Sequence, residues 1–489
     1  MFKRSWPVLW GAALVLAVTW PFLLPGSEFL WRDMAVPETF GLTPANFGAG
    51  DLAARAAPQD GVFALFSTLL PAPFLLRALV VSAAAAAAWG AWLLAPTTPA
   101  MFLAVINPFT VERLLQGQWS LAVAAWLLVL LAAAGLRGRP YLAWAALFGA
   151  SLTPTGALLG LATGVATVKG RRLATAGLGL AVCVPWLVPG LIDSLHPAPL
   201  SDAPSSVAAF APRAEAGAGT LGSLLQLGGL WNADALPASR QAGFAVFGFG
   251  VLACVLVGLR RVPWPLLALG AAGLGGAIGC WLLPDVLASV IDAFPGAGIL
   301  RDSGKLVALA LPAYVAALGA LDRRGIIAAL ICLVLQMPDA ATSVSVLAPR
   351  ESSIDTRLVG ELSGRAAFFA DRPNLVEVTA QDGTRAPAVD PYSKAVAQIA
   401  SGELVVDGQV VDTPSPRWVA ARTAWEARDT AELERLGIGA VVEDGRVVTT
   451  TNAPAPGAPW VLTVAWLLLP LAVLLVAAFR RASDRKSVV

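Results

Sequence analysis

Residues 120–136 read SLAVAAWLLVLLAAAGL, an uncharged apolar run that stops at Arg137. A helix needs about 20 apolar residues, within a range of about 17–25, to cross the hydrocarbon core of a bilayer. The run therefore predicts a membrane-spanning helix, and it is typical of the chain. Hydrophobic residues make up 57% of the 489 residues and charged residues only 13%, against about 25% in a soluble domain. This composition excludes a water-soluble globular enzyme, a disordered chain and a disulfide scaffold, and it indicates a polytopic membrane protein.

Further apolar runs raise the number of predicted spanning segments to twelve. The first follows Lys3 and Arg4 and has no small-residue cleavage site after it, so we expect an uncleaved anchor. Several others are short, and the Pro-containing break at 151–156 indicates two half-length helices that meet at a turn. The segments are 6–24, 74–94, 100–111, 120–136, 141–152, 156–168, 173–191, 242–259, 262–283, 306–321, 325–336 and 460–479.

The basic residues of the short loops indicate the orientation. Cytoplasmic loops carry an excess of Lys and Arg, and an inside N-terminus with twelve crossings puts most of these residues on the inner side. If 141–168 formed one helix, the basic loop at 169–172 would lie outside instead. We therefore expect a multi-pass protein of the plasma membrane with both termini in the cytoplasm. The inner basic residues are Lys3, Arg4, Arg137, Arg139, Lys169, Arg171, Arg172, Arg260, Arg261, Arg323, Arg324, Arg480, Arg481, Arg485 and Lys486.

Three parts follow from this arrangement. They are a transmembrane core at 1–336 with large outer loops at 25–72 and 192–241, an extracytoplasmic domain at 337–459, and a final transmembrane helix with a cytoplasmic tail at 460–489. The predicted fold class is an all-α polytopic membrane protein with a small extracytoplasmic α/β domain.

The extracytoplasmic domain is set apart by its many charged residues. Its pattern predicts a helix at 420–436, a strand at 438–442 and a returning strand at 446–451. A second hairpin is expected at 403–411, with its turn at Asp407-Gly408. The alternative to a domain with chemistry of its own is a lid or docking module.

The predicted spans contain almost no ionisable residues, so chemistry is expected at their outer ends. Asp33 follows Arg32 shortly after the first span, and a carboxylate at the membrane surface can act as a general base toward a hydroxyl. Arg32 would bind a phosphate or neutralise Asp33. Asp60 precedes the short apolar stretch 61–70, where it would contact substrate or cap an interfacial helix. The simpler alternative for both carboxylates is a structural role in a solvated loop.

A second polar group follows Asn107-Pro108, which breaks a helix at the outer boundary. Glu112, Arg113 and Gln116 are the substrate-binding residues predicted there. The alternative is that Glu112 and Arg113 form an ion pair that only anchors the loop.

A third polar group, Arg301, Asp302 and Lys305, lies just before another predicted span. Arg301 and Lys305 are four residues apart, so on a helix they would share a face and could clamp a phosphate. The alternative is interfacial anchoring.

No metal site or cofactor is expected. Cys183, Cys254, Cys280 and Cys332 fall inside apolar runs without CxxC or Cys/His spacing, and the chain has one His. A zinc site or a disulfide framework is therefore excluded, and nothing in the sequence supports a divalent cation. The net charge of +2 is too small to indicate nucleic acid.

Taken in order, the rim segments resemble the GT-C superfamily of polytopic membrane glycosyltransferases, especially the large actinobacterial type. The likeness covers most of the chain in layout and rests on short motifs. These are Arg32-Asp33, Asn107-Pro108…Glu112-Arg113-Leu114…Gly117-Gln118-Trp119, Leu300-Arg301-Asp302…Lys305 and Leu433-Glu434-Arg435-Leu436-Gly437-Ile438…Val441-Val442. Many members carry two adjacent acidic residues in the first outer loop, whereas here Asp33 is followed by Met34.

The resemblance implies an enzyme that takes a sugar from a polyprenyl-phosphate donor and transfers it, on the outer face, to a cell-envelope glycan or glycolipid acceptor. It places the catalytic base at Asp33 and implies inversion at the anomeric carbon, with the donor phosphate near Arg113, Arg301 or Lys305. The alternative is a non-catalytic membrane protein, either a lipid carrier, a flippase or an assembly partner of envelope-synthesis proteins. In that case Asp33 would be dispensable.

Overall fold

The computed structural model describes residues 2–194, 203–294, 296–406 and 408–486. Six helical segments in this part of the chain are long and apolar enough to cross a membrane. Two further helices, separated by a bend of 56°, would make a seventh span. The six are Ser5–Leu23, Ala72–Leu94, Trp119–Leu136, Phe244–Arg261, Trp264–Leu282 and Arg323–Leu347, and the bent pair is Arg172–Ala181 with Val184–Asp193.

The last predicted span, 460–479, lies in a helix of 26 residues, Val461–Lys486, whose apolar part is Val461–Leu475. The remaining predicted spans are helical but shorter than a bilayer is thick. At 1.5 Å per residue, the 11 residues of α7 extend only about 16 Å, against a hydrocarbon core of about 30 Å. The segment predicted at 100–111 is divided in two, because Asn107 ends the first helix and caps the next one by accepting a hydrogen bond from the Thr110 N–H at 3.1 Å. Helix length and composition therefore give six or seven candidate spans among the described residues, and the count of twelve stays a prediction.

The helices begin and end as follows: α1 (Phe2–Thr19), α2 (Gln59–Phe66), α3 (Ala72–Leu94), α4 (Thr98–Val105), α5 (Pro108–Leu115), α6 (Trp119–Leu136), α7 (Pro140–Ala150), α8 (Pro154–Thr167), α9 (Arg172–Ala181), α10 (Val184–Ser194), α11 (Ala203–Ala209), α12 (Gly219–Leu225), α13 (Ala238–Gln241), α14 (Gly248–Gly258), α15 (Trp264–Leu282), α16 (Pro284–Ala293), α17 (Leu311–Leu318), α18 (Arg323–Leu335), α19 (Ala340–Ser343), α20 (Thr356–Glu361), α21 (Tyr392–Ala395), α22 (Pro416–Glu426), α23 (Thr430–Arg435) and α24 (Val461–Lys486).

The strands are β1 (Phe29–Trp31), β2 (Met34–Val36), β3 (Ala366–Phe369), β4 (Leu375–Thr379), β5 (Arg385–Val389), β6 (Ala397–Gln398), β7 (Leu404–Val406), β8 (Gln409–Asp412), β9 (Ala440–Glu443) and β10 (Arg446–Thr450). Short 3₁₀ segments lie between these elements, and η6 (Ala297–Leu300) and η7 (Ser303–Ala310) matter for the site.

Helix α6 forms the centre of the helical body. Of its residues, 89% are buried, and the Trp126 indole N–H donates to the Val105 carbonyl at 3.0 Å. Helix α3 packs so closely that a Cβ at Gly90 would lie 2.6 Å from the Cα of Leu130. The helices α14, α15 and α18 lie at the periphery and keep apolar side chains such as Val257 and Ile331 exposed, as expected of faces that contact lipid.

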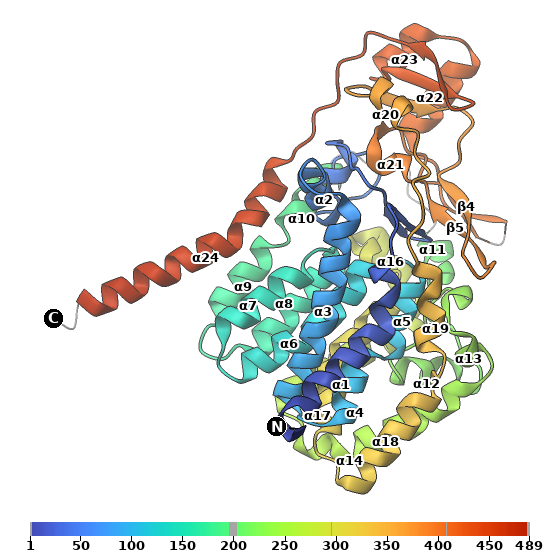
Figure 1. The fold of residues 1–489 in the computed structure, drawn as a ribbon. Coiled ribbons are helices and arrows are strands. Elements are labelled where there is room, and N and C mark those ends of the chain that lie inside the picture. Colours follow the sequence, from blue (N-terminus) through green and yellow to red (C-terminus); the bar gives the residue numbers. More distant parts are fainter. Residues whose placement is uncertain (1, 195–202, 295, 407, 487–489) are drawn as a thin grey trace.

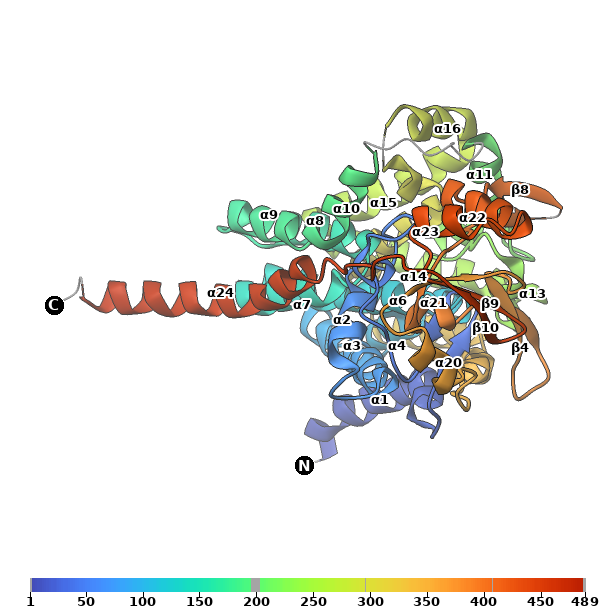
Figure 2. The same cartoon turned by 90° about the horizontal axis from the view of Figure 1, so that it is seen from above.

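The strand-containing region lies at one end of the helical body, and the N-terminus lies at the other (Figure 1). Viewed from the end that carries the strands, the region lies over one side of the helical body, and α24 projects from the opposite side (Figure 2). The main sheet has the order β10-β9-β3-β6, with β9 antiparallel to β10 and parallel to β3. The fold is thus mostly helical with a small region of helices and strands, as the sequence indicated.

Two of the hairpins predicted for this region are confirmed. Strands β9 and β10 match the predicted pair, although β9 begins later because the Ile438 N–H donates to the Leu433 carbonyl at the end of α23. Strands β7 and β8 form the second hairpin, and Asp407 at its turn lies outside the described residues.

The single helix predicted at 420–436 is wrong. The chain breaks between α22 and α23, where Arg428 adopts a positive φ of 58°. Asp429 then caps α23 by accepting a hydrogen bond from the Glu432 N–H at 2.9 Å. The apolar pattern continues across this break, so it predicted one helix where the chain forms two.

Candidate functional site

A two-residue hairpin carries Arg32 and Asp33. Strands β1 and β2 pair Trp31 with Met34, and both of these side chains are buried. All six strand residues are buried, and Arg32 at the tip is buried as well, so Asp33 is the exposed residue of the tip. Trp31 fixes the hairpin to the end of α5, since its indole N–H donates to the Leu115 carbonyl at 2.9 Å. Met34 is buried in the core. It stands where many members of the resembled superfamily carry a second acidic residue, so this hairpin presents one carboxylate.

The hairpin tip rests directly on the connection between α5 and α6. Gly117 adopts a φ of +81° there, and a Cβ at this position would collide with the backbone nitrogen of Met34 and the carbonyl oxygen of Trp31. Only glycine allows both the backbone conformation and the close approach. The Asp33 N–H donates to the Gln116 carbonyl at 3.1 Å, which fixes the backbone of the tip.

A chain of hydrogen bonds joins three motifs that are far apart in the sequence. The Gln118 amide donates to Asp33 Oδ2 at 3.0 Å and accepts from Arg113 Nη1 at 2.8 Å. Arg113 in turn donates to both carboxylate oxygens of Asp302, at 2.6 and 3.0 Å. Lys305 Nζ lies 3.6 Å from Asp302 Oδ2 and completes the series. We call these five residues the rim cluster.

The side chain of Asp33 is exposed, whereas the Arg113–Asp302 ion pair beneath it is buried. Surrounding protein nevertheless raises the pKa of Asp33, while hydrogen bonds from Gln118 and Gln116 and the charge of Lys305 lower it. In the part of the chain that the structure describes, Asp33 is in no ion pair, so its carboxylate is free to accept a proton.

Opposing effects act on the two charged residues next to Asp33. Burial would raise the pKa of Asp302, but Arg113 and Lys305 outweigh it and hold the pKa below its ordinary value. Burial lowers the pKa of Lys305, Asp302 opposes this, and the cations Arg113, Arg55 and Arg301 add to the lowering. The region around Lys305 is therefore rich in positive charge.

Arg301 and Lys305 do not share a helical face, which corrects the sequence prediction. Arg301 lies between η6 and η7, and Lys305 lies in η7. In a 3₁₀-helix residues three apart are aligned, so Lys305 faces Asp302. Arg301 instead donates to both oxygens of Asp412 in β8, at 2.9 and 3.0 Å, and stacks on Phe210 at 4.0 Å.

Glu112 and Gln116 hold the loop that contains Leu230 and Asn232. Glu112 accepts from the Leu230 N–H at 3.3 Å and pairs with Arg240, which also binds Glu215. Burial, and next the charge of Glu215, raise the pKa of Glu112. Gln116 accepts from the Asn232 amide at 2.7 Å. Glu112 therefore supports the site from beside it, whereas Gln116 also hydrogen-bonds to Asp33.

Arg32 and Asp60 are also engaged in structural contacts. Arg32 is buried and donates to the Asp234 carbonyl at 3.0 Å. Asp60 lies at the start of α2, where it pairs with Lys394 of the strand-containing region at 2.7 Å and makes no cap. Asp51 pairs similarly with Arg417 at 3.2 Å. The loop at 25–72 therefore contacts the strand-containing region through ion pairs, and Asp60 is not part of the rim cluster.

Sequence reasoning missed several residues that complete the arrangement. Gln118 belongs to the Gly117-Gln118-Trp119 motif but was not predicted as a site residue, and neither were Arg55, Glu215 and Arg240. Arg55 is 67% exposed and lies 3.9 Å from Asp412. Desolvation by the surrounding protein, and next the charge of Arg301, lower the pKa of Arg55 to about 10. Arg55 therefore stays charged at neutral pH.

No group of three or more His, Cys, Asp and Glu side chains in the described residues is placed to hold a metal ion. Comparisons with known proteins give no family: no family model, no curated protein and no solved structure matches this chain. The function therefore has to be argued from the rim cluster itself.

The buried ion pair gives the first prediction. Removing one partner leaves an uncompensated buried charge, so Arg113→Gln and Asp302→Asn should each lower the free energy of unfolding by about 3–5 kcal/mol. The double variant should cost clearly less than the sum, because the two side chains act as a unit. Denaturant titration of the detergent-purified protein measures all three.

The exposed pair Arg422–Glu426 is the matched control, with side chains that are 60% and 65% exposed. Its double-mutant cycle should give a coupling of about 0.3–0.5 kcal/mol. An additive result for Arg113 and Asp302 would mean that they do not stabilise each other.

Proposed function

We propose that this chain is a membrane glycosyltransferase of the GT-C type. It would move a sugar from a polyprenyl-phosphate donor to a cell-envelope glycan or glycolipid acceptor on the outer face of the plasma membrane, without a cofactor. The observation that carries the proposal is the rim cluster: an accessible, unpaired Asp33 carboxylate held by Gln118 next to a cation-rich surface at the end of apolar helices.

The proposal includes twelve crossings with both termini in the cytoplasm. The short helices α7 and α8 would then cross as half-length segments beside α6, and the basic loops would face the cytoplasm. The position of the N-terminus, at the opposite end from the strand-containing region (Figure 1), supports this orientation. Residues 337–459 would then lie outside the cell.

Cysteine labelling tests the orientation. A cysteine at Val410, exposed on β8, should react with a membrane-impermeant maleimide in intact cells. Arg324→Cys, which is exposed beside α18, should react only after permeabilisation. The unsubstituted protein gives the background of the four native cysteines, and the reverse labelling pattern would contradict the orientation.

The proposed chemical step is a displacement at the anomeric carbon. Asp33 accepts the proton of an acceptor hydroxyl. At the same time, the hydroxyl oxygen attacks the anomeric carbon from the face opposite the phosphate. The new C–O bond forms as the bond to the phosphate oxygen breaks, and polyprenyl phosphate leaves with the electron pair. The proton remains on Asp33 until water removes it. The product has inverted configuration.

The charge around Asp33 suits a phosphate leaving group. Lys305 and Arg55 are partly or largely exposed, so their cations are available to an anion. Arg301 already binds Asp412, so it would bind phosphate only by releasing Asp412. Lys305 is therefore the residue that we assign to the donor phosphate, with Arg55 beside it.

Replacing the base gives the central test. Asp33→Asn keeps the shape and the hydrogen bond from Gln118 but removes the proton acceptor. Transfer of sugar from a polyprenyl-phosphate donor, or complementation of a deletion strain, should fall by about 10²-fold or more at normal protein level. Glu38→Gln, an exposed carboxylate in the same loop, should leave activity unchanged. Full activity of Asp33→Asn would favour the non-catalytic carrier or assembly protein instead.

The charge of Lys305 gives a signed pH prediction. Activity needs ionised Asp33, so it rises with pH through the pKa of this residue, and Lys305 lowers that pKa. Lys305→Met should therefore shift the acidic limb of the kcat/KM profile to higher pH, whereas Lys305→Arg should leave the limb in place. A lower rate without a shifted limb would show that Lys305 does not act on Asp33.

A further inference from the structure

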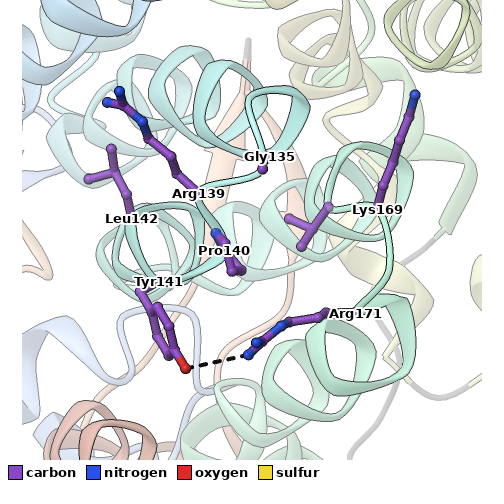
Figure 3. A pocket seen from close by; sticks show the side chains of 9 residues that line it. Gly135, Arg139, Pro140, Tyr141, Leu142, Lys169 and Arg171 are labelled. Atoms are coloured by element: carbon purple, nitrogen blue, oxygen red, sulfur yellow. Dashed lines mark hydrogen bonds between the residues drawn. The ribbon is translucent and has the colours of Figure 1, made fainter. Parts of the chain in front are cut away.

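A concave region lies at the end of α6 that is opposite the rim cluster. Helix α6 starts beside Gln118 of the rim cluster and ends before Arg137. Its 18 residues extend about 27 Å, close to the hydrocarbon thickness of a bilayer. The cavity at this far end has a volume of about 510 Å³ and is lined by Arg139, Lys169 and Arg171 among others (Figure 3). An adjoining cavity of about 540 Å³ shares Arg171.

The region is strongly and exclusively basic. Arg137, Arg139, Lys169, Arg171 and Arg172 are all exposed there, and the sequence contains no Asp or Glu between Glu112 and Asp193. Within the described residues none of the five cations is in an ion pair. Their positive charge is therefore available to bind an anionic ligand.

One of the cations is held in place by aromatic side chains. The Arg171 guanidinium lies 5.5 Å from the ring centre of Tyr141 and 5.8 Å from that of Trp144. It also donates to the Tyr141 hydroxyl at 3.4 Å (Figure 3). Trp144 is fixed in turn by its hydrogen bond to Thr175 Oγ1 at 2.9 Å. A cation fixed in this way loses less freedom when it binds an anion.

The apolar surface beside the cavity indicates a lipid rather than a soluble anion. Leu173 follows the basic loop and is 90% exposed, and Leu180 farther along α9 is 59% exposed. Such side chains are unfavourable in water and suited to acyl chains. Trp and Tyr are also the residues found at the headgroup level of a membrane.

We propose that this region, formed by Arg139, Lys169 and Arg171 with Tyr141 and Trp144, is a binding site for the headgroup of an anionic phospholipid. The phosphate binds at the Arg171 guanidinium, and Arg139 and Lys169, whose charged ends point away from Arg171 (Figure 3), add positive charge around the cavity. The acyl chains lie along α9. The site is at the opposite membrane surface from the rim cluster, and it does not depend on glycosyl transfer.

Native mass spectrometry of the full-length protein in detergent tests the site, with phosphatidylglycerol and phosphatidylcholine as probes. Phosphatidylglycerol should bind in preference. Each basic residue near a membrane surface contributes about 1 kcal/mol, so Arg139→Gln/Lys169→Gln/Arg171→Gln should weaken binding about 100-fold. Tyr141→Leu keeps every charge but frees Arg171, and it should weaken binding several-fold.

The matched control is Arg260→Gln/Arg323→Gln/Arg324→Gln, which removes the same charge from exposed residues elsewhere and should keep binding. Equal losses in both triple variants would show general attraction to charge and overturn the site. Equal binding of phosphatidylcholine would also overturn it. Inorganic phosphate is the last probe. If it raises the unfolding temperature as much as the lipid does, and the same residues are needed, the site would bind a soluble anion instead. Unfolding temperatures without lipid verify that each variant is folded.

Discussion

The ion pair between Arg113 and Asp302 is the contact on which the candidate site depends. It joins α5 to the start of η7, across 189 residues of sequence, and both side chains are almost fully buried. A buried pair of this kind is weak evidence for stability by itself, because desolvation offsets much of the attraction. Its geometric consequence is clearer. Arg113 uses its third hydrogen bond to orient Gln118, and Gln118 orients the one carboxylate that remains exposed.

The polar residues of α5 are divided between two faces with different tasks. Arg113 faces the rim cluster, whereas Glu112 faces the buried group formed with Arg240 and Glu215. The second group fixes the outer loop that also holds Arg32 through the carbonyl of Asp234. The conformation of the hairpin tip is therefore determined from both sides, which is the kind of support that a precisely placed base requires.

The strand-containing region is attached to the same surface by charge pairs. Asp51 and Asp60 in the loop at 25–72 bind Arg417 and Lys394, and Asp412 binds both Arg301 and Arg55. Within the described residues, four ion pairs thus attach the region to the end of the helical body. Because Arg301 is the cation closest in sequence to the rim cluster, an anion that competes for it would act on this attachment as well.

The sequence by itself determined the features that depend on composition and on local pattern. Long apolar runs have to form helices that hide their backbone from lipid, and the hairpins around Gly408 and Gly445 follow from their turn residues. The sequence also indicated which segments carry polar residues at the outer rim, including Asp33, Arg113 and Asp302. Tertiary structure decided which of them meet. Gln118 connects Asp33 to Arg113 only because Gly117 allows the hairpin to touch the α5–α6 connection. Arg301 and Lys305 do not share a face because the chain forms a 3₁₀-helix there. Asp60 pairs with Lys394, which is 334 residues away in the sequence. Spacing along a chain cannot specify such contacts, because they depend on distances that only the packed backbone fixes.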